Sequence, residues 1–191
     1  MSLILASQSP RRQQLLGQMG LSFQVKIADI DETMDPGLSA REAVAEVSAR
    51  KARAVEAEGG DVIVAADTIV VVDGRILGKP HSQDEAKKML RLLSGRTHEV
   101  MTGLTVRRGE KSVSTTEITK VTFREMSEGE IESYVASGDP MDKAGSYGVQ
   151  GLAAVFVSSL EGDYFNVMGL PLCALCPLLR QFGVEILGEK G

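Results

Sequence analysis

The sequence lacks several features that define particular classes of protein. It has only two cysteines in 191 residues and therefore no disulfide framework, which fits a reducing compartment. No apolar run approaches the roughly 18 residues that a membrane-spanning helix needs. Residues 1–6 also lack the basic start of a signal peptide. We therefore expect a soluble, cytoplasmic protein with no membrane partner.

The chain also lacks an excess of positive charge. Its 21 Lys and Arg residues are outnumbered by 26 Asp and Glu residues, for a formal net charge of −5. Binding to nucleic acid without regard to sequence requires a broad basic face, so we expect no nucleic-acid partner and only a local anion site. The two histidines, His81 and His98, lie in no pattern of nucleophile and base, which argues against a hydrolytic triad.

What the sequence does contain is an alternation of strand and helix patterns, with no internal repeat, low-complexity tract or linker. This predicts one α/β domain over residues 1–191 with a mixed, partly antiparallel sheet. The predicted strands are 2–6, 21–27, 62–72, 75–77, 99–107, 112–124 and 153–160. The predicted helices are 10–19, a helix from Ser39 to about residue 56, one from Ser82 to Gly95, one from Ser127 to near Gly138, and 171–182, perturbed at Pro177. Residues 28–38 and 138–151 are predicted to be an acidic loop and a glycine-rich loop.

The stretch SQSPRRQQLL places two arginines at the start of a predicted helix. Ser9 is the expected N-cap and Pro10 the first helical residue. A helix N-terminus attracts anions, and an arginine fork matches phosphate oxygens in pairs. Two cations at this positive end are misplaced unless an anion joins them. Ser7, Ser9, Arg11 and Arg12 therefore predict a phosphate site, and the alternative is a cap beside solvated arginines.

Asp67 interrupts an apolar run, VIVAADTIVVV, that otherwise reads as a buried strand. An isolated charge there would be costly, so a metal ion, a cation or a cleft must solvate it. Such a carboxylate can be a metal ligand or a general base toward water. The alternative is a structural aspartate that bonds backbone groups with help from Thr68.

Other candidates are weaker when taken alone. Glu32 in the acidic loop can supply a second carboxylate to a hard cation, although such loops are more often simply solvated. Lys79 and Lys143 can neutralise phosphate or be ordinary surface lysines, and for Lys51, in an Arg-Lys-Ala-Arg cluster, a solvated helix face is the default. The Gln150 amide can read a base edge or stabilise its loop.

Cys173 and Cys176 have the C-x-x-C spacing of redox and metal sites. They fall on one face of an apolar predicted helix, without a second pair of ligands. Packing in the core is therefore the favoured interpretation.

Several separated stretches carry unusual residue patterns: LASQSPRRQQLL, AADTIVVVDGRILGKP, LSGRTHEVMTG, and DKAGSYGVQGLAAVFV followed by GDYFNVMGLPL. In this order, they resemble the motifs of the Maf family of nucleoside triphosphate pyrophosphatases. The resemblance covers nearly the whole chain. It implies an α/β fold similar to that of the inosine triphosphate pyrophosphatases, with an elongated mixed sheet flanked by helices and two lobes around a cleft. It also implies a homodimer.

The resemblance further implies hydrolysis of a nucleoside triphosphate between its α- and β-phosphates, with Mg²⁺, Mn²⁺ or Co²⁺. Asp67 matches the family's proton acceptor, and Asp67 with Glu32 matches its metal ligands. Arg11, Thr68 and Gln150 match positions tied to substrate choice. The remaining matches are positions that the family places around the phosphates and the metal: Ser7, Arg12, Lys51, Lys79 and Lys143. Of these, Lys79 is expected to take part in catalysis together with Asp67.

The segment SYGVQG is similar to the family branch that acts on dTTP and UTP. The branch that acts on 7-methyl-GTP carries a glutamate-containing segment instead. A carboxamide such as that of Gln150 accepts from N3–H and donates to O4 of a pyrimidine. We therefore expect a dTTP/UTP pyrophosphatase with a housekeeping role in the nucleotide pool, acting also on modified pyrimidine nucleotides. The alternatives are the same chemistry on 7-methyl-GTP and a non-enzymatic nucleotide-binding regulator of septum formation and cell division.

Overall fold

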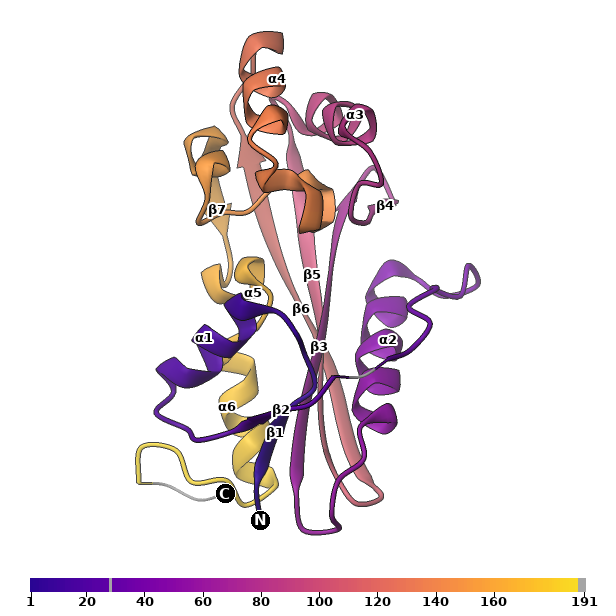
Figure 1. The fold of residues 1–191 in the computed structure, drawn as a ribbon, viewed down its shortest axis with the longest axis vertical. Helices are drawn as coiled ribbons and strands as arrows, with labels where there is room; N and C mark the ends of the chain where they lie inside the picture. Colours follow the sequence, from indigo (N-terminus) through magenta and orange to yellow (C-terminus); the bar gives the residue numbers. More distant parts are fainter. Residues whose placement is uncertain (28, 189–191) are drawn as a thin grey trace. The chain divides into compact units, whose positions relative to one another are not determined.

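The structure is a computed structural model that describes residues 1–27 and 29–188 (Figure 1). Ala28, the first residue of the predicted acidic loop, lies outside the described residues. Seven strands form a mixed sheet in an α/β fold. Their order is β2 (Gln24–Val25), β1 (Leu3–Leu5), β3 (Val62–Val72), β5 (Thr97–Arg108), β6 (Lys111–Phe123) and β7 (Val157–Glu161), and β4 (Arg75–Leu77) pairs with β3. The prediction of a mixed sheet flanked by helices is confirmed. Across the described ranges, no helix combines the length and apolarity needed to cross a bilayer.

The chain divides into two compact units, each assembled from separate segments. Unit 1 contains Met1–Asp67, Thr102–Glu117 and the described residues from Gly169 onward. Unit 2 contains Thr68–Met101 and Ile118–Met168. Three long strands contribute to both units: β3 (Val62–Val72), β5 (Thr97–Arg108) and β6 (Lys111–Phe123).

Unit 1 begins with β1 (Leu3–Leu5), which pairs in parallel with β2 (Gln24–Val25) and with the first residues of β3. Its helices are α1 (Pro10–Gln18), α2 (Ala40–Ala54) and α6 (Leu172–Gln181). Ser9 caps α1, and Ser39 and Glu42 form the predicted capping box of α2. β1 and the unit 1 part of β3 are almost wholly apolar and buried, as expected for strands covered on both faces.

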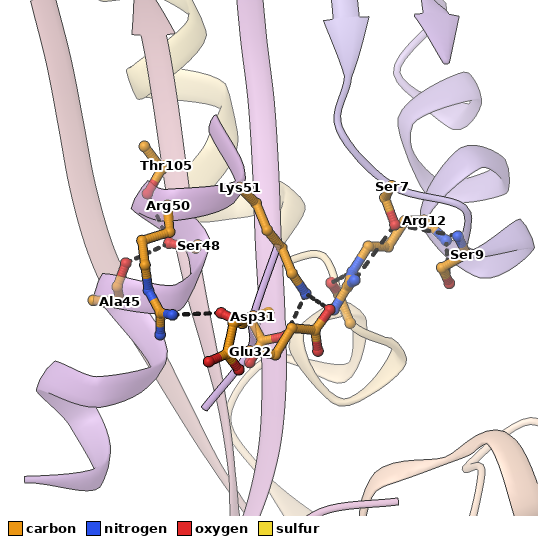
Figure 2. Close-up of polar contacts among 12 residues, drawn as sticks. Ser7, Ser9, Arg12, Asp31, Glu32, Ala45, Ser48, Arg50, Lys51 and Thr105 are labelled. Atoms are coloured by element: carbon orange, nitrogen blue, oxygen red, sulfur yellow. Dashed lines mark hydrogen bonds and ion pairs between the residues drawn. The ribbon is translucent and has the colours of Figure 1, made fainter. Parts of the chain in front are cut away.

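Helix α2 approaches β5 very closely. A Cβ atom added to Gly103 would lie 2.1 Å from the carbonyl oxygen of Val44, so only glycine fits this position. A hydrogen bond adds a second connection, because the buried Ser48 Oγ lies 2.7 Å from the buried Thr105 Oγ1 (Figure 2). Thr105 Oγ1 also lies 2.8 Å from Ser114 Oγ. These contacts fix α2, and with it Lys51, against the sheet.

Unit 2 contains β4 (Arg75–Leu77), α3 (Gln83–Leu93), α4 (Glu128–Ala136), β7 (Val157–Glu161) and α5 (Tyr164–Met168). The predicted turn at Asp73 and Gly74 is confirmed, with positive φ angles of 49° and 73°. Packed aromatic rings, including Phe123, Tyr134 and Phe156, contribute to the core.

Several predicted elements differ from the structure. Residues 21–27 form only the two-residue strand Gln24–Val25, whose side chains are exposed, because no second apolar face covers them. Residues 152–156 form a 3₁₀ helix, so the strand predicted from 153 starts at Val157. Helix α5 was not predicted. The glycine-rich loop contains two short 3₁₀ helices, Asp139–Asp142 and Ala144–Ser146.

Candidate active site

Asp67 and Lys51 form a buried ion pair in unit 1. Lys51 Nζ lies 2.7 Å from Asp67 Oδ1, and the two side chains are only 10% and 12% exposed. β3 carries Asp67 inside its apolar run, and α2 delivers Lys51 from its last turns. The Lys51 ammonium group supplies the positive charge that a carboxylate among apolar neighbours needs. The default interpretation of Lys51 as a solvated surface lysine is wrong.

Glu32 joins the same ammonium group from the acidic loop. Its Oε1 lies 2.9 Å from Lys51 Nζ, and its side chain is 54% exposed. Figure 2 shows Glu32 beside Lys51. Lys51 therefore bridges one buried and one half-exposed carboxylate, and the alternative that Glu32 is only part of a solvated acidic loop is wrong.

Arg12 lies at the start of α1 and is already bound by protein groups. Its Nε donates to the carbonyl oxygen of Gly169 at 2.7 Å, and its Nη1 donates to Ser7 Oγ at 3.4 Å (Figure 2). Ser9 Oγ accepts from the backbone N–H of Arg12 as the predicted cap. Burial lowers the pKa of Arg12, and the Asp67 carboxylate opposes this change. Arg12 is thus no solvated surface arginine, and Arg11 beside it is half-buried.

Lys143 is held by acidic groups within unit 2. Its Nζ donates to the carbonyl and Oδ1 of Asp139 and, at 2.7 Å, to Asp142 Oδ1. Its side chain is 12% exposed, so the alternative of an ordinary surface lysine is wrong. A Cβ added to Gly148 would lie 2.8 Å from Lys143 Cε, so this glycine leaves the path that the lysine occupies.

Of the other unit 2 candidates, Lys79 and Gln150 lie outside the helices and strands, and Thr68 lies in β3. The Gly145 N–H donates to Gly78 O at 3.0 Å, which connects the glycine-rich loop to the segment carrying Lys79. Lys79 and Gln150 are exposed. Thr68 follows Asp67 directly in β3 and is half-buried.

The structure adds two residues that sequence reasoning missed. Asp139 precedes Lys143 by four positions, the spacing of ion pairs on a helix, and this signal was available. Arg50 contacts the acidic loop through backbone carbonyls of Asp31 and Thr33, which no side-chain pattern reveals.

The cysteines and histidines have no part in this arrangement. Cys173 is exposed and Cys176 is partly buried, so the prediction of core packing is wrong: α6 buries Leu175, Leu178 and Leu179 instead. His98 is buried with its Nε2 2.7 Å from the Tyr147 hydroxyl, and burial lowers its pKa to about 4. His81 is exposed.

The carboxylate oxygens of Asp67 and Glu32 fit a divalent cation whose other ligands are phosphates and water. Asp67 and Glu32 offer hard oxygen atoms to one cationic atom, Lys51 Nζ. In the ranges 1–27 and 29–188, no group of three or more His, Cys, Asp or Glu side chains is placed to hold a metal. Mg²⁺ usually binds through one or two carboxylates plus phosphates and water, so two carboxylates suit it.

Comparison with solved structures identifies the class of fold. A HAM1 protein from Coxiella burnetii aligns with a TM-score of 0.51 and 16% identity, over 95% of this chain and 99% of that one. The Ham1 protein of Staphylococcus aureus aligns with a TM-score of 0.51 and 14% identity over the same shares. The chain has the fold of the Ham1 proteins.

Sequence comparison then gives the family. The family model described as Maf-like protein matches residues 2–182, so the chain belongs to the Maf family. A protein of Bacillus cereus strain B4264, named dTTP/UTP pyrophosphatase, is 46% identical over 96% of this chain and 97% of its own length. A protein of the same name from Bacillus thuringiensis subsp. konkukian strain 97-27 is 47% identical over the same shares.

Proposed function

We propose that this protein hydrolyses dTTP and UTP to the nucleoside monophosphate and pyrophosphate, and so helps to maintain the nucleotide pool. The observation that carries the proposal is the buried Asp67 carboxylate, paired with Lys51 and lying in the same unit as Arg12. Relatives 46–47% identical over almost the whole chain carry the name of this activity.

In the proposed reaction, Asp67 accepts a proton from the water that attacks the α-phosphorus. The bond between the α-phosphorus and the bridging oxygen breaks, and pyrophosphate leaves. Lys51 orients the Asp67 carboxylate through their 2.7 Å contact. Arg11, Arg12 and Ser7 bind phosphate oxygens at the start of α1, where backbone N–H groups add to the arginine charge.

Asp67 and Glu32 are the residues proposed to hold Mg²⁺, Mn²⁺ or Co²⁺ together with the substrate phosphates. When bound, such an ion neutralises phosphate charge and polarises the α-phosphorus. Lys51 lies between the same two carboxylates and balances their negative charge.

The unit 2 candidates complete the proposal on the strength of the family motifs. Lys79 and Lys143 balance the charge that accumulates on the leaving pyrophosphate. Gln150 reads the pyrimidine edge, and Thr68 and Arg11 contribute to substrate choice. Lys143 must exchange its contact with the exposed Asp142 carboxylate for a contact with phosphate.

A panel of nucleoside triphosphates tests the activity. dTTP, UTP, their modified forms, purine nucleotides and 7-methyl-GTP are assayed with Mg²⁺, Mn²⁺ and Co²⁺, and pyrophosphate is measured against orthophosphate. We expect pyrophosphate as the first product, with dTTP and UTP as the best substrates. Orthophosphate as the first product, a preference for 7-methyl-GTP, or nucleotide binding without turnover would each contradict the proposal.

The substitution Asp67→Asn tests the assigned base. We expect the rate of pyrophosphate release to fall by about 10²–10⁴-fold, because a positioned general base contributes about that much. The variant should still fold and bind dTTP. Asp73→Asn is the matched control, since Asp73 directly follows the same strand, is exposed and pairs with Arg96. Equal rates in the two variants would remove Asp67 from the mechanism.

The family motifs also support a cytoplasmic location and a homodimer as parts of this proposal. Light scattering coupled to gel filtration measures the oligomeric state directly. A mass equal to that of one chain at micromolar concentration would contradict the dimer.

A further inference from the structure

We propose that Arg50 is a positioning residue for this reaction: it holds the backbone on both sides of Glu32 and thereby fixes the Glu32 carboxylate beside Lys51 and Asp67. The inference rests on the proposed function, in which Glu32 helps to bind the metal. It concerns a residue of the Arg-Lys-Ala-Arg cluster that the sequence marks as a solvated helix face.

Arg50 uses all three nitrogens of its guanidinium group. Nε donates to Glu46 Oε2 at 2.6 Å, one turn earlier on α2, which fixes the orientation of the side chain. Nη1 donates to the carbonyl oxygen of Asp31, and Nη2 donates to that of Thr33 at 2.7 Å. The two carbonyls belong to the residues directly before and after Glu32. Figure 2 shows the contact between Arg50 and Asp31, next to Glu32.

The segment around Glu32 is largely exposed. Asp31, Glu32 and Thr33 are exposed, and the nearby apolar side chains of Ile30 and Met34 are only partly buried. Asp31 Oδ1 accepts from the Thr33 N–H at 2.8 Å and makes a tight turn around Glu32. Hydrogen bonds from the Thr33 side chain and from its backbone N–H lower the pKa of Asp31, with a smaller contribution from the Arg50 charge. A turn of this kind sets local shape, whereas the contacts from Arg50 attach it to α2.

Arg50 and Lys51 are consecutive on α2 and therefore point about 100° apart around the helix axis. Lys51 points to the carboxylates of Asp67 and Glu32, and Arg50 points to the backbone that carries Glu32. One turn of α2 thus sets both the Asp67 partner and the position of the second carboxylate. Since Gly103 and Ser48 fix the helix on the sheet, the loop takes its position from the same scaffold.

Binding both carbonyls requires the two terminal nitrogens of a guanidinium group. Two carbonyls separated by one residue are reached by two nitrogens of one rigid plane, whereas a lysine offers a single ammonium group on a flexible stem. A displacement of about 1 Å in a positioning group can cost about 10²-fold in rate. The Arg50 guanidinium group therefore matters to the reaction without touching the substrate.

The test compares Arg50→Lys with Arg53→Lys. Arg53 lies one turn further along α2, is 60% exposed and contacts the same Glu46 at 3.5 Å, which makes it the matched control. For Arg50→Lys we expect kcat to fall by about 10–10²-fold and half-activation to need several-fold more Mg²⁺, while the KM for dTTP at saturating metal changes by less than about threefold. Arg53→Lys should match the unsubstituted protein in each measurement.

Two readouts do not depend on activity. Binding of Mn²⁺, measured by electron paramagnetic resonance with a non-hydrolysable dTTP analogue, should weaken in Arg50→Lys and stay unchanged in Arg53→Lys. Hydrogen exchange at the Thr33 amide should become faster in Arg50→Lys, while the α2 amides keep their protection. Unchanged exchange at Thr33 and unchanged Mn²⁺ binding would overturn the inference.

Glu32→Gln separates this inference from the proposed function. If the unsubstituted protein releases no pyrophosphate, the proposed function fails. If Glu32→Gln is as active as the unsubstituted protein, the proposed metal site fails. If Glu32→Gln is impaired and Arg50→Lys is not, only the role of Arg50 fails. If Arg50 acts through Glu32, the double variant is no slower than Glu32→Gln alone.

Discussion

His98 is a neutral base enclosed by aromatic rings. The ring centroid of Phe123 lies 5.0 Å away and that of Tyr147 5.3 Å away, both edge-on. Its Nδ1 is buried without a hydrogen-bond partner among the described residues. A proton on this ring would create a charge in an apolar site, which is why burial lowers the pKa of His98 to about 4.

This pKa makes stability depend on pH. In the unfolded chain the pKa of histidine is about 6.5, so between pH 6.5 and pH 4 the unfolded state binds a proton that the folded state does not. The free energy of unfolding therefore falls as the pH is lowered, by about 3 kcal/mol from this residue. His98→Gln keeps a partner for the Tyr147 hydroxyl and removes the titration.

Urea unfolding at pH 7.5 and pH 4.5 measures the effect. We expect the free energy lost between the two pH values to be smaller in His98→Gln than in the unsubstituted protein by about 2–3 kcal/mol. Carboxylates that titrate in the same range cancel in this difference. An equal loss in both proteins would mean that His98 is protonated in the folded state.

Residue-level prediction from the sequence succeeds where a residue type conflicts with its surroundings. Asp67 stands out because a carboxylate interrupts an apolar strand, and it proves to be buried and paired. Its partner could not be identified, because Lys51 fits the polar face of an amphipathic helix and only the tertiary fold brings it to Asp67. Residues that act through backbone carbonyls, such as Arg50, cannot be recognised from the sequence, because every residue carries a carbonyl group.

At the scale of elements, the contact between α2 and β5 gives a sharp prediction. Gly103→Ala would place a methyl group 2.1 Å from Val44 O and 2.7 Å from Ala45 N, both backbone atoms that cannot swing aside. Helix α2 must move outward and take Lys51 with it. We expect a loss of about 1–3 kcal/mol or more in stability, with a fall in kcat.

Gly17→Ala is the control for this substitution. Gly17 lies in α1 of the same unit, and nothing lies within 4 Å of its added Cβ. Alanine is the better helix former, so this variant should be more stable by about 0.5–1 kcal/mol. Thermal unfolding of both variants decides the matter, and similar melting temperatures would mean that α2 can shift at no cost.

The element predictions failed where local pattern and tertiary pairing disagree. Residues 21–27 alternate as a strand does, yet only Gln24 and Val25 pair with β1, because the neighbouring side chains find no second apolar layer. The stretch 152–156 is apolar enough for a strand but closes into a 3₁₀ helix after Gly151. By contrast, the four N-caps Ser9, Ser39, Ser82 and Ser127 were found because capping is a local interaction.

At the scale of the whole molecule, three strands of the sheet are shared by the two units. β3, β5 and β6 each begin in one unit and end in the other. Loss of either unit would leave these strands half-paired. We therefore expect one cooperative thermal transition, with calorimetric and van't Hoff enthalpies that agree at about 130 kcal/mol.

Differential scanning calorimetry tests this directly. Two resolved transitions, or a van't Hoff enthalpy near half of the calorimetric value, would show that the units melt independently.

The α/β class and the mixed sheet could be predicted from the alternation of strand and helix patterns in the sequence. The division into two discontinuous units could not be derived from patterns alone, because it depends on which distant segments pack together, and only the family resemblance pointed to two lobes.

The hydrogen bond from Arg12 to the carbonyl of Gly169 has a consequence for protein synthesis. Every side chain proposed to take part in the chemistry precedes residue 151, yet the group that holds Arg12 comes later, at the start of the segment that forms α6. A nascent chain that has reached Met168 therefore carries all of these side chains while unit 1 is still incomplete. At about 5–20 residues per second, translation from Gly169 through α6 takes roughly 1–3 s. A ribosome that stalls in this interval would hold a chain with all its proposed chemical groups and no competent site.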